Sequence, residues 1–98
     1  MILGHTQPAA TTLVDAYTAA APAVVKIVAA NRAAATEFRI ALAPLGAADA
    51  ADHYVVYDKP IEANDALVSA AVDLETGDVV RVRSTSGSVV FQVNGIEV

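Results

Sequence analysis

The stretch TEFRIAL, residues 36–42, decides the fold class. Its three large apolar residues fall on one side of an extended chain, whereas Glu37 and Arg39 fall on the other. This period of two is typical of a half-buried β-strand, because successive side chains of a strand point to opposite faces. The stretch therefore predicts a strand with Phe38, Ile40 and Leu42 on its core face.

The same alternation recurs towards the C-terminus. Arg81 and Arg83 alternate with valines, and the run VVFQV at 89–93 is rich in β-branched residues, which suit a pleated surface. Turn residues (Gly, Pro, Asn and Asp) separate the runs. The expected strands cover residues 11–18, 23–31, 36–43, 53–59, 66–74, 78–84 and 88–94, with a short tail strand at 96–98. Seven or eight short strands predict an all-β fold, a small β-sandwich or jelly-roll-like domain.

The segments between the strands carry finer expectations. Residues 73–78 and 84–88 are polar and predict hairpin loops, and Asn94-Gly95 predicts a bulge or a turn. Residues 47–52 are rich in Ala and Asp and could form one helical turn on a corner. The rival interpretation is an α+β fold with a helix near residues 19–35. An internal proline and a run of β-branched residues count against that helix.

Composition indicates one domain with a surplus of apolar residues, more than a core of this size can bury. The chain has 98 residues, of which 55% are hydrophobic and 17% charged, and its mean hydropathy is +0.48. We expect a single β domain over residues 1–98, with residues 1–10 as an extended N-terminal arm. A domain this small keeps roughly a third of its unfolded-chain surface in water, so we interpret the surplus as contact surface between subunits. The alternative is a monomer with an Ala-rich surface.

Charge and hydropathy argue against two classes of partner. The net charge is −5, and the six basic residues are dispersed, so the sequence predicts no nucleic-acid binding. The apolar stretch 13–30 is interrupted by Asp15, Pro22 and Lys26, and it predicts no membrane span. There is no cysteine, which removes disulfides and thiolate chemistry.

No motif predicts catalysis, a cofactor or a metal. His53 follows Asp49 and Asp52, but a zinc site needs three or four ligands and no second histidine is near, so we expect a surface histidine at the entry of a strand. The acidic turn 73–78 lacks the ligand spacing of an EF-hand. Residues 84–88 lack the Gly-x-Ser-x-Gly frame of a nucleophile elbow.

The tyrosines and the alternating charges are candidate contact residues. Strict alternation places Tyr54 and Tyr57 on opposite faces of one strand, which favours core or interface packing over a joint platform for carbohydrate. We take as possible assembly contacts His5, Gln7, Tyr17, Glu37, Arg39, Arg81 and Arg83.

Short motifs along nearly the whole chain resemble a group of small virion structural proteins of tailed bacteriophages and prophages. They are QPAATTL at 7–13, DAYT at 15–18, NR at 31–32, FRIA at 38–41, PLGAA at 44–48, HY at 53–54, YD at 57–58, AND at 63–65 and GDVVRV at 77–82. The resemblance implies a protein of the phage particle, assembled in the cytoplasm of the bacterial host. It does not distinguish head from tail.

These observations lead to one functional hypothesis and three alternatives. We expect a non-enzymatic accessory subunit that decorates or stabilises the capsid, forms a homotrimer, and contacts the major capsid protein or tail proteins. The first alternative is a tail-tip, baseplate or fibre-attached subunit. The second is a carbohydrate-binding module for adhesion to the host, and an enzyme is the remaining alternative.

Overall fold

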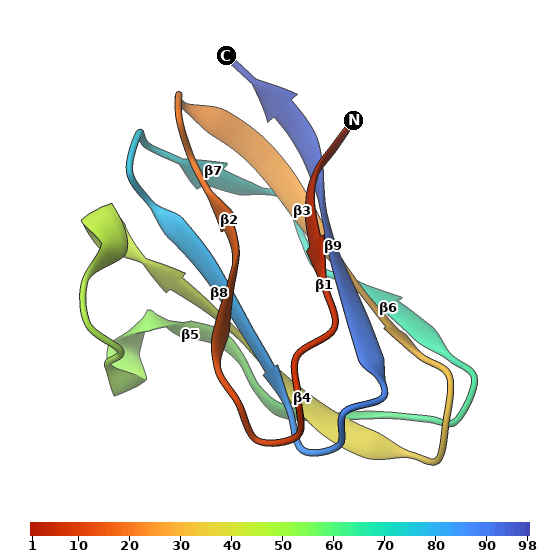
Figure 1. The fold of residues 1–98 in the computed structure, drawn as a ribbon. Coiled ribbons are helices and arrows are strands. Elements are labelled where there is room, and N and C mark those ends of the chain that lie inside the picture. The colour runs from red at the N-terminus through yellow and green to blue at the C-terminus, as the bar shows by residue number, and fades with distance from the viewer.

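The computed structural model describes residues 1–98, and the protein is built almost entirely of β-strands (Figure 1). The strands are β1 (Ile2–Thr6), β2 (Val14–Thr18), β3 (Ala23–Asn31), β4 (Thr36–Ala43), β5 (Tyr54–Ile61), β6 (Ala66–Val68), β7 (Val72–Leu74), β8 (Val79–Ser84) and β9 (Val89–Glu97). Two short 3-10 turns, η1 (Pro44–Gly46) and η2 (Ala51–His53), lie between β4 and β5. The predicted all-β class is confirmed, and β3 occupies the region of the rival helix.

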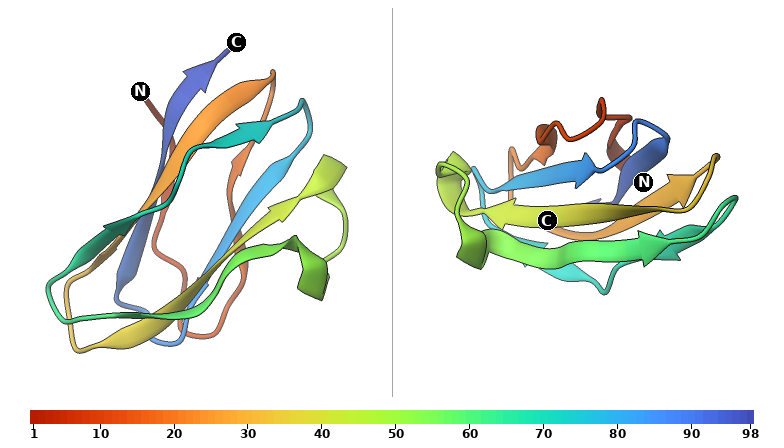
Figure 2. Two further views of the ribbon diagram at one scale, coloured as in Figure 1. Left: turned by 180° about the vertical axis from the view of Figure 1, so that it is seen from behind. Right: turned by 90° about the horizontal axis from the view of Figure 1, so that it is seen from below.

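The strands form two antiparallel sheets that pack face to face (Figure 2). Sheet A has the order β1-β9-β3-β6, with β7 also paired to β3, and sheet B has the order β2-β8-β4-β5. Strand β1 therefore pairs with β9, β2 with β8, β3 with β6 and β7, and β4 with β5. This is the pairing of one long hairpin whose tip lies between β4 and β5. Rolling that hairpin up gives the strand order of a jelly roll.

The core is formed by the inward-facing residues of both sheets. In β3 and β9, buried and more exposed residues alternate. In β4, Phe38 and Ile40 are buried as predicted, with 3% and 1% of their surface exposed. Leu42 is only partly buried and packs against the core. The Phe38 ring lies 5.9 Å from the ring of Phe91 in the opposite sheet. One cluster of 14 buried residues thus joins the two sheets.

The N-terminal residues belong to the body of the sandwich, and the prediction of a separate arm over residues 1–10 is wrong for β1. This strand pairs with β9, and Leu3 packs against the core. A Cβ at Gly4 would lie 2.3 Å from the carbonyl oxygen of Ala16 in β2, so only glycine fits there. The sandwich is therefore closed by backbone contact along its β1/β2 edge.

Most connections cross between the sheets, which corrects two hairpin predictions. Residues 75–78 lead from β7 in sheet A to β8 in sheet B, and residues 85–88 lead back to β9 in sheet A. The carboxylate of Asp78 is an anchor, because it accepts hydrogen bonds from the backbone N–H of Leu45 at 3.1 Å and of Glu75 at 2.9 Å. Turn residues reverse the chain equally well within a sheet or between sheets, so their identity does not distinguish the two cases.

Three smaller predictions also need correction. The strand expected over 66–74 is two strands, because Ser69 interrupts the ladder and its hydroxyl accepts the hydrogen bond from Ile27 N–H at 2.9 Å. Strand β9 continues through Asn94-Gly95, where a Cβ on Gly95 would lie 2.1 Å from the carbonyl oxygen of Val24. The helical turn expected at 47–52 is shorter and lies later, because only its last two residues belong to η2, while η1 precedes the segment.

No helix in the structure has the length and apolar character needed to cross a membrane.

Candidate functional site

Two irregularities in the pairing of β5 with β4 decide where the tyrosines of β5 point. Phe38 pairs with Lys59 and Ile40 pairs with Val56, so two residues of β5 face the single residue between Phe38 and Ile40. A second irregularity follows, because Ala41 pairs with Tyr54. Bulges of this kind redirect side chains relative to a regular pleat.

The second irregularity, in which Val55 is the extra residue, brings Tyr54 and Tyr57 together on the outer face of sheet B, so the prediction that they point to opposite faces is wrong. Their ring centroids are 5.2 Å apart with an interplanar angle of 86°, an edge-to-face contact. The sequence-based prediction assumed an unbroken alternation, and the extra residue between the tyrosines breaks it.

Arg39 completes a cluster with the two tyrosines. Its Nε donates to Asp58 Oδ1 at 2.6 Å and its Nη2 donates to Oδ2 at 3.1 Å, which is a bidentate ion pair. The guanidinium carbon lies 4.0 Å from the centroid of the Tyr57 ring and 5.9 Å from that of Tyr54. We refer to Arg39, Tyr54, Tyr57 and Asp58 as the tyrosine–arginine cluster.

The backbone of the cluster is held in an uncommon conformation. Asp58 has a φ of 49°, in the left-handed region that few residues other than glycine adopt. Its carboxylate reaches Arg39 from this position in the bulge. The ion pair and the bulge therefore depend on each other.

Electrostatics keep the cluster in one protonation state near neutral pH. The hydrogen bond from Arg39 lowers the pKa of Asp58 below its usual range and raises the pKa of Arg39. Burial raises the pKa of Tyr54, and the hydrogen bond from its hydroxyl to Asp49 at 3.3 Å raises it further. Arg39 and Asp58 are thus ionised while Tyr54 is a neutral phenol.

Arg83 and Glu37 adjoin the cluster on the same face of sheet B. Arg83 is the cross-strand neighbour of Arg39 and has no ion-pair partner within 4 Å. Its positive charge also lowers the pKa of Asp58. Glu37 lies two residues before Arg39 and is exposed. Three predicted contact residues, Glu37, Arg39 and Arg83, are therefore brought together.

The other predicted contact residues are dispersed, and three of them have partners within the chain. Arg81 donates to Asp15 at 3.0 Å and to the carbonyl oxygen of Ala47 at 2.6 Å, so it fastens the loop between β4 and β5 to sheet B. The Gln7 amide donates to the carbonyl of Gly87 at 2.8 Å, and the Tyr17 hydroxyl donates to Glu97 at 2.9 Å. His5 is exposed on the opposite sheet.

The predicted strand-entry histidine, His53, ends η2 directly before β5. Its side chain is 14% exposed, and its Nε2 lies 4.0 Å from Asp52. Its buried Nδ1 has no hydrogen-bond partner. Asp49, the other acidic residue considered with His53 as a metal ligand, accepts a hydrogen bond from the Tyr54 hydroxyl. The structure contains no group of three or more His, Cys, Asp or Glu side chains placed to hold a metal ion.

The outer face of sheet A presents an apolar surface to solvent. Alternation in β3 and β9 turns Val24, Val28, Val90 and Ile96 outward. Val24 pairs with Ile96, Val28 lies between Gln92 and Val68, and Val90 pairs with Ala30. We call this surface the valine face and define it as Ile2, Val24, Val28, Val68, Val90 and Ile96. Its most exposed members are Ile96 at 66%, Val68 at 61% and Ile2 at 59%. A shallow hollow of about 260 Å³ lies beside Val24, Gly95 and Ile96.

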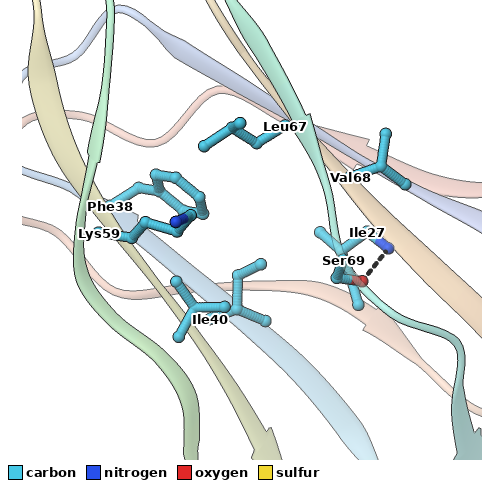
Figure 3. Close-up of a pocket in the computed structure, with 8 residues that line it drawn as sticks. Ile27, Phe38, Ile40, Lys59, Leu67, Val68 and Ser69 are labelled. Carbon is cyan, nitrogen blue, oxygen red and sulfur yellow. Dashed lines mark hydrogen bonds between the residues drawn. The ribbon is translucent and has the colours of Figure 1, made fainter.

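A smaller cavity of about 80 Å³ lies at the edge opposite β1/β2, where β5 and β6 border the two sheets (Figure 3). Phe38 and Leu67 extend into it from the two sides, and Lys59 lies beside Phe38. Ser69 is hydrogen-bonded to Ile27 on its far side. The hydrophobic core therefore reaches the surface at this edge.

No protein-family model, curated protein or solved structure matches this chain.

Proposed function

We propose that this protein is a non-enzymatic structural subunit of a tailed-phage virion, a small accessory protein that decorates the capsid and packs against copies of itself. The valine face is the observation that carries the self-association. The phage assignment rests on the motif resemblance. A jelly roll is compatible with it, because viral capsid domains use this architecture, although the fold alone does not determine a function.

The valine face has the chemistry of a contact between identical subunits. Covering one Val or Ile side chain fully is worth about 1.5–3 kcal/mol, so several such side chains favour association strongly. The molecule extends over 36 × 27 × 19 Å, and a sheet face of this size can supply the roughly 800 Å² per partner of a standard interface.

The few charges on the outer face of sheet A are complementary to one another. Lys26 and Asp73 lie on neighbouring outward positions of β3 and β7, are exposed, and form no ion pair within the chain. In a closed oligomer one copy of Lys26 can approach Asp73 of another copy. We therefore propose that a second copy of this chain covers the valine face, in a trimer or another closed oligomer.

The proposal is tested by counting this protein in purified virions of a phage that encodes it, using mass spectrometry with labelled peptide standards. A copy number comparable with that of the major capsid protein is expected. A handful of copies per particle would contradict decoration and support the tail-tip or baseplate alternative. Absence from the particle would contradict a virion role altogether.

A further inference from the structure

We propose that the tyrosine–arginine cluster on sheet B is a binding site for a glycan, with the exposed face of Tyr57 as its stacking surface. The proposal is independent of subunit assembly, because the cluster and the valine face lie on opposite sheets. It rests on the exposure of Tyr57, on the fixed geometry around it and on the polar atoms left free beside it.

Tyr57 is exposed and also held in place. Sixty per cent of its surface is accessible, yet Arg39 lies 4.0 Å from its ring centroid and the Tyr54 ring packs edge-to-face against it. An aromatic ring that is already ordered loses little conformational freedom when a ligand covers it. Tyr57 therefore offers a preformed flat surface about the size of one pyranose ring.

The polar groups around the ring suit a ligand with many hydroxyls. Arg39 uses Nε and Nη2 on Asp58, which leaves Nη1 without a hydrogen bond. The Tyr57 hydroxyl and the Arg83 guanidinium also have no partner within the chain. A pyranose presents C–H groups on one face and hydroxyls around its rim. It can therefore stack on Tyr57 while its hydroxyls bond to fixed donors and to the Asp58 carboxylate.

The two bulges support a binding role over simple surface packing. A regular strand would place Tyr54 on the core side of β5, and the extra residue Val55 brings it to Tyr57 instead. Asp58 adopts its left-handed conformation within one of these bulges. Bulges and strained residues of this kind concentrate at functional sites.

The test is an NMR titration of the isotope-labelled full chain with glucose, galactose, N-acetylglucosamine and galacturonic acid, preceded by a printed array of bacterial surface glycans. At least one glycan is expected to shift the backbone signals of residues 54–58 and the side-chain signal of Arg39. If no glycan shifts these signals, or if the shifts centre elsewhere, the proposal is overturned. If the NMR signals of the cluster shift with protein concentration alone, the cluster is a contact between copies of the chain, and the glycan proposal is overturned as well.

Variants separate stacking from damage to the fold. Tyr57→Ala should weaken binding by about tenfold or more, the equivalent of about 1.4 kcal/mol, while Tyr57→Phe should retain most of it. Val98→Ala, which changes an exposed residue outside both the cluster and the valine face, is the control and should bind like the parent protein. Thermal melts of all three must show intact folds. Equal binding by the parent and Tyr57→Ala would contradict the site.

Discussion

Asn31 is a buried polar residue whose side chain joins three connections at one end of the sandwich. Its Nδ2 donates to the carbonyls of Ala34 at 2.9 Å and Glu62 at 3.2 Å, and its Oδ1 accepts from Ala33 N–H at 3.2 Å and from the Ser88 hydroxyl at 2.8 Å. These partners lie in three different connections. All hydrogen-bonding positions of the amide are thus used.

Replacing this residue tests the importance of that junction. Asn31→Ala should lower the free energy of unfolding by about 2–4 kcal/mol, because it leaves several partly buried groups without a partner. Urea melts measure the effect, with Asn94→Ala as the control, since the Asn94 side chain makes no hydrogen bond. Equal stability of Asn31→Ala and the parent protein would contradict the role assigned to the junction.

Phe38 tests the register of β4 at the same scale. Phe38→Ala should cost about 3–5 kcal/mol, because it removes a large buried side chain and leaves a cavity. Glu37→Ala, on the exposed side of the strand, should cost under about 0.5 kcal/mol. Denaturant melts decide the matter: a neutral Phe38→Ala beside a destabilising Glu37→Ala would place the strand one residue out of register.

Arg39 shows where reasoning from alternation reaches its limit. The pattern of residues 36–42 correctly places Arg39 on the outer face, where a solvated arginine would be dispensable. The structure instead gives it a bidentate partner and two aromatic neighbours, all from β5. We therefore expect Arg39→Ala to be more destabilising than Glu37→Ala. Contacts between strands depend on their register and on bulges, and neither can be predicted from the sequence of one strand alone.

At the scale of elements, the alternating runs identified β4, β8 and β9 because one face of each is buried. The sequence also predicted a strand at β5, but it did not predict which way its side chains point, because bulges change which face each side chain joins. Reasoning from alternation failed for β1, because five residues containing a glycine and a histidine carry little periodic information. The strand is interrupted at Ser69 because its side-chain hydroxyl, and not a backbone carbonyl, accepts the hydrogen bond from Ile27 N–H. Local strand propensity does not predict such a change of hydrogen-bond partner.

The bulge in β5 predicts a pH dependence of stability. Because Arg39 lowers the pKa of Asp58 in the folded state, the ionised carboxylate stabilises the fold at neutral pH. This contribution is lost as the pH falls below about 4 towards the folded-state pKa. Asp58→Asn should therefore be less stable than the parent protein at pH 7, and the difference should narrow as the pH falls.

Thermal melts between about pH 7 and pH 2 check this prediction. Glu62→Gln is the matched control, because Glu62 is exposed and its side chain makes no hydrogen bond or ion pair. A stability difference between the parent and Asp58→Asn that stays constant over this range would show that the ion pair does not stabilise the bulge.

At the scale of the whole molecule, the jelly roll separates two surfaces of different chemistry. Sheet A turns valines and isoleucines to solvent, while sheet B carries arginines, acids and the two tyrosines of β5. Composition predicted the apolar surplus without its location, because a percentage does not say which face carries the residues. The closed β1/β2 edge and the open β5/β6 edge arise from the way the long hairpin is rolled.

Sedimentation velocity at micromolar concentration tests most directly whether the valine face joins copies of this chain, as we propose. The parent protein should sediment as a trimer or another closed oligomer. Val68→Lys should sediment as a folded monomer, because association would bury an unpaired ammonium group. Val55→Lys, a matched exposed valine on sheet B, should remain oligomeric. A parent protein that sediments as a monomer, or a Val68→Lys variant that associates like the parent, would contradict the account.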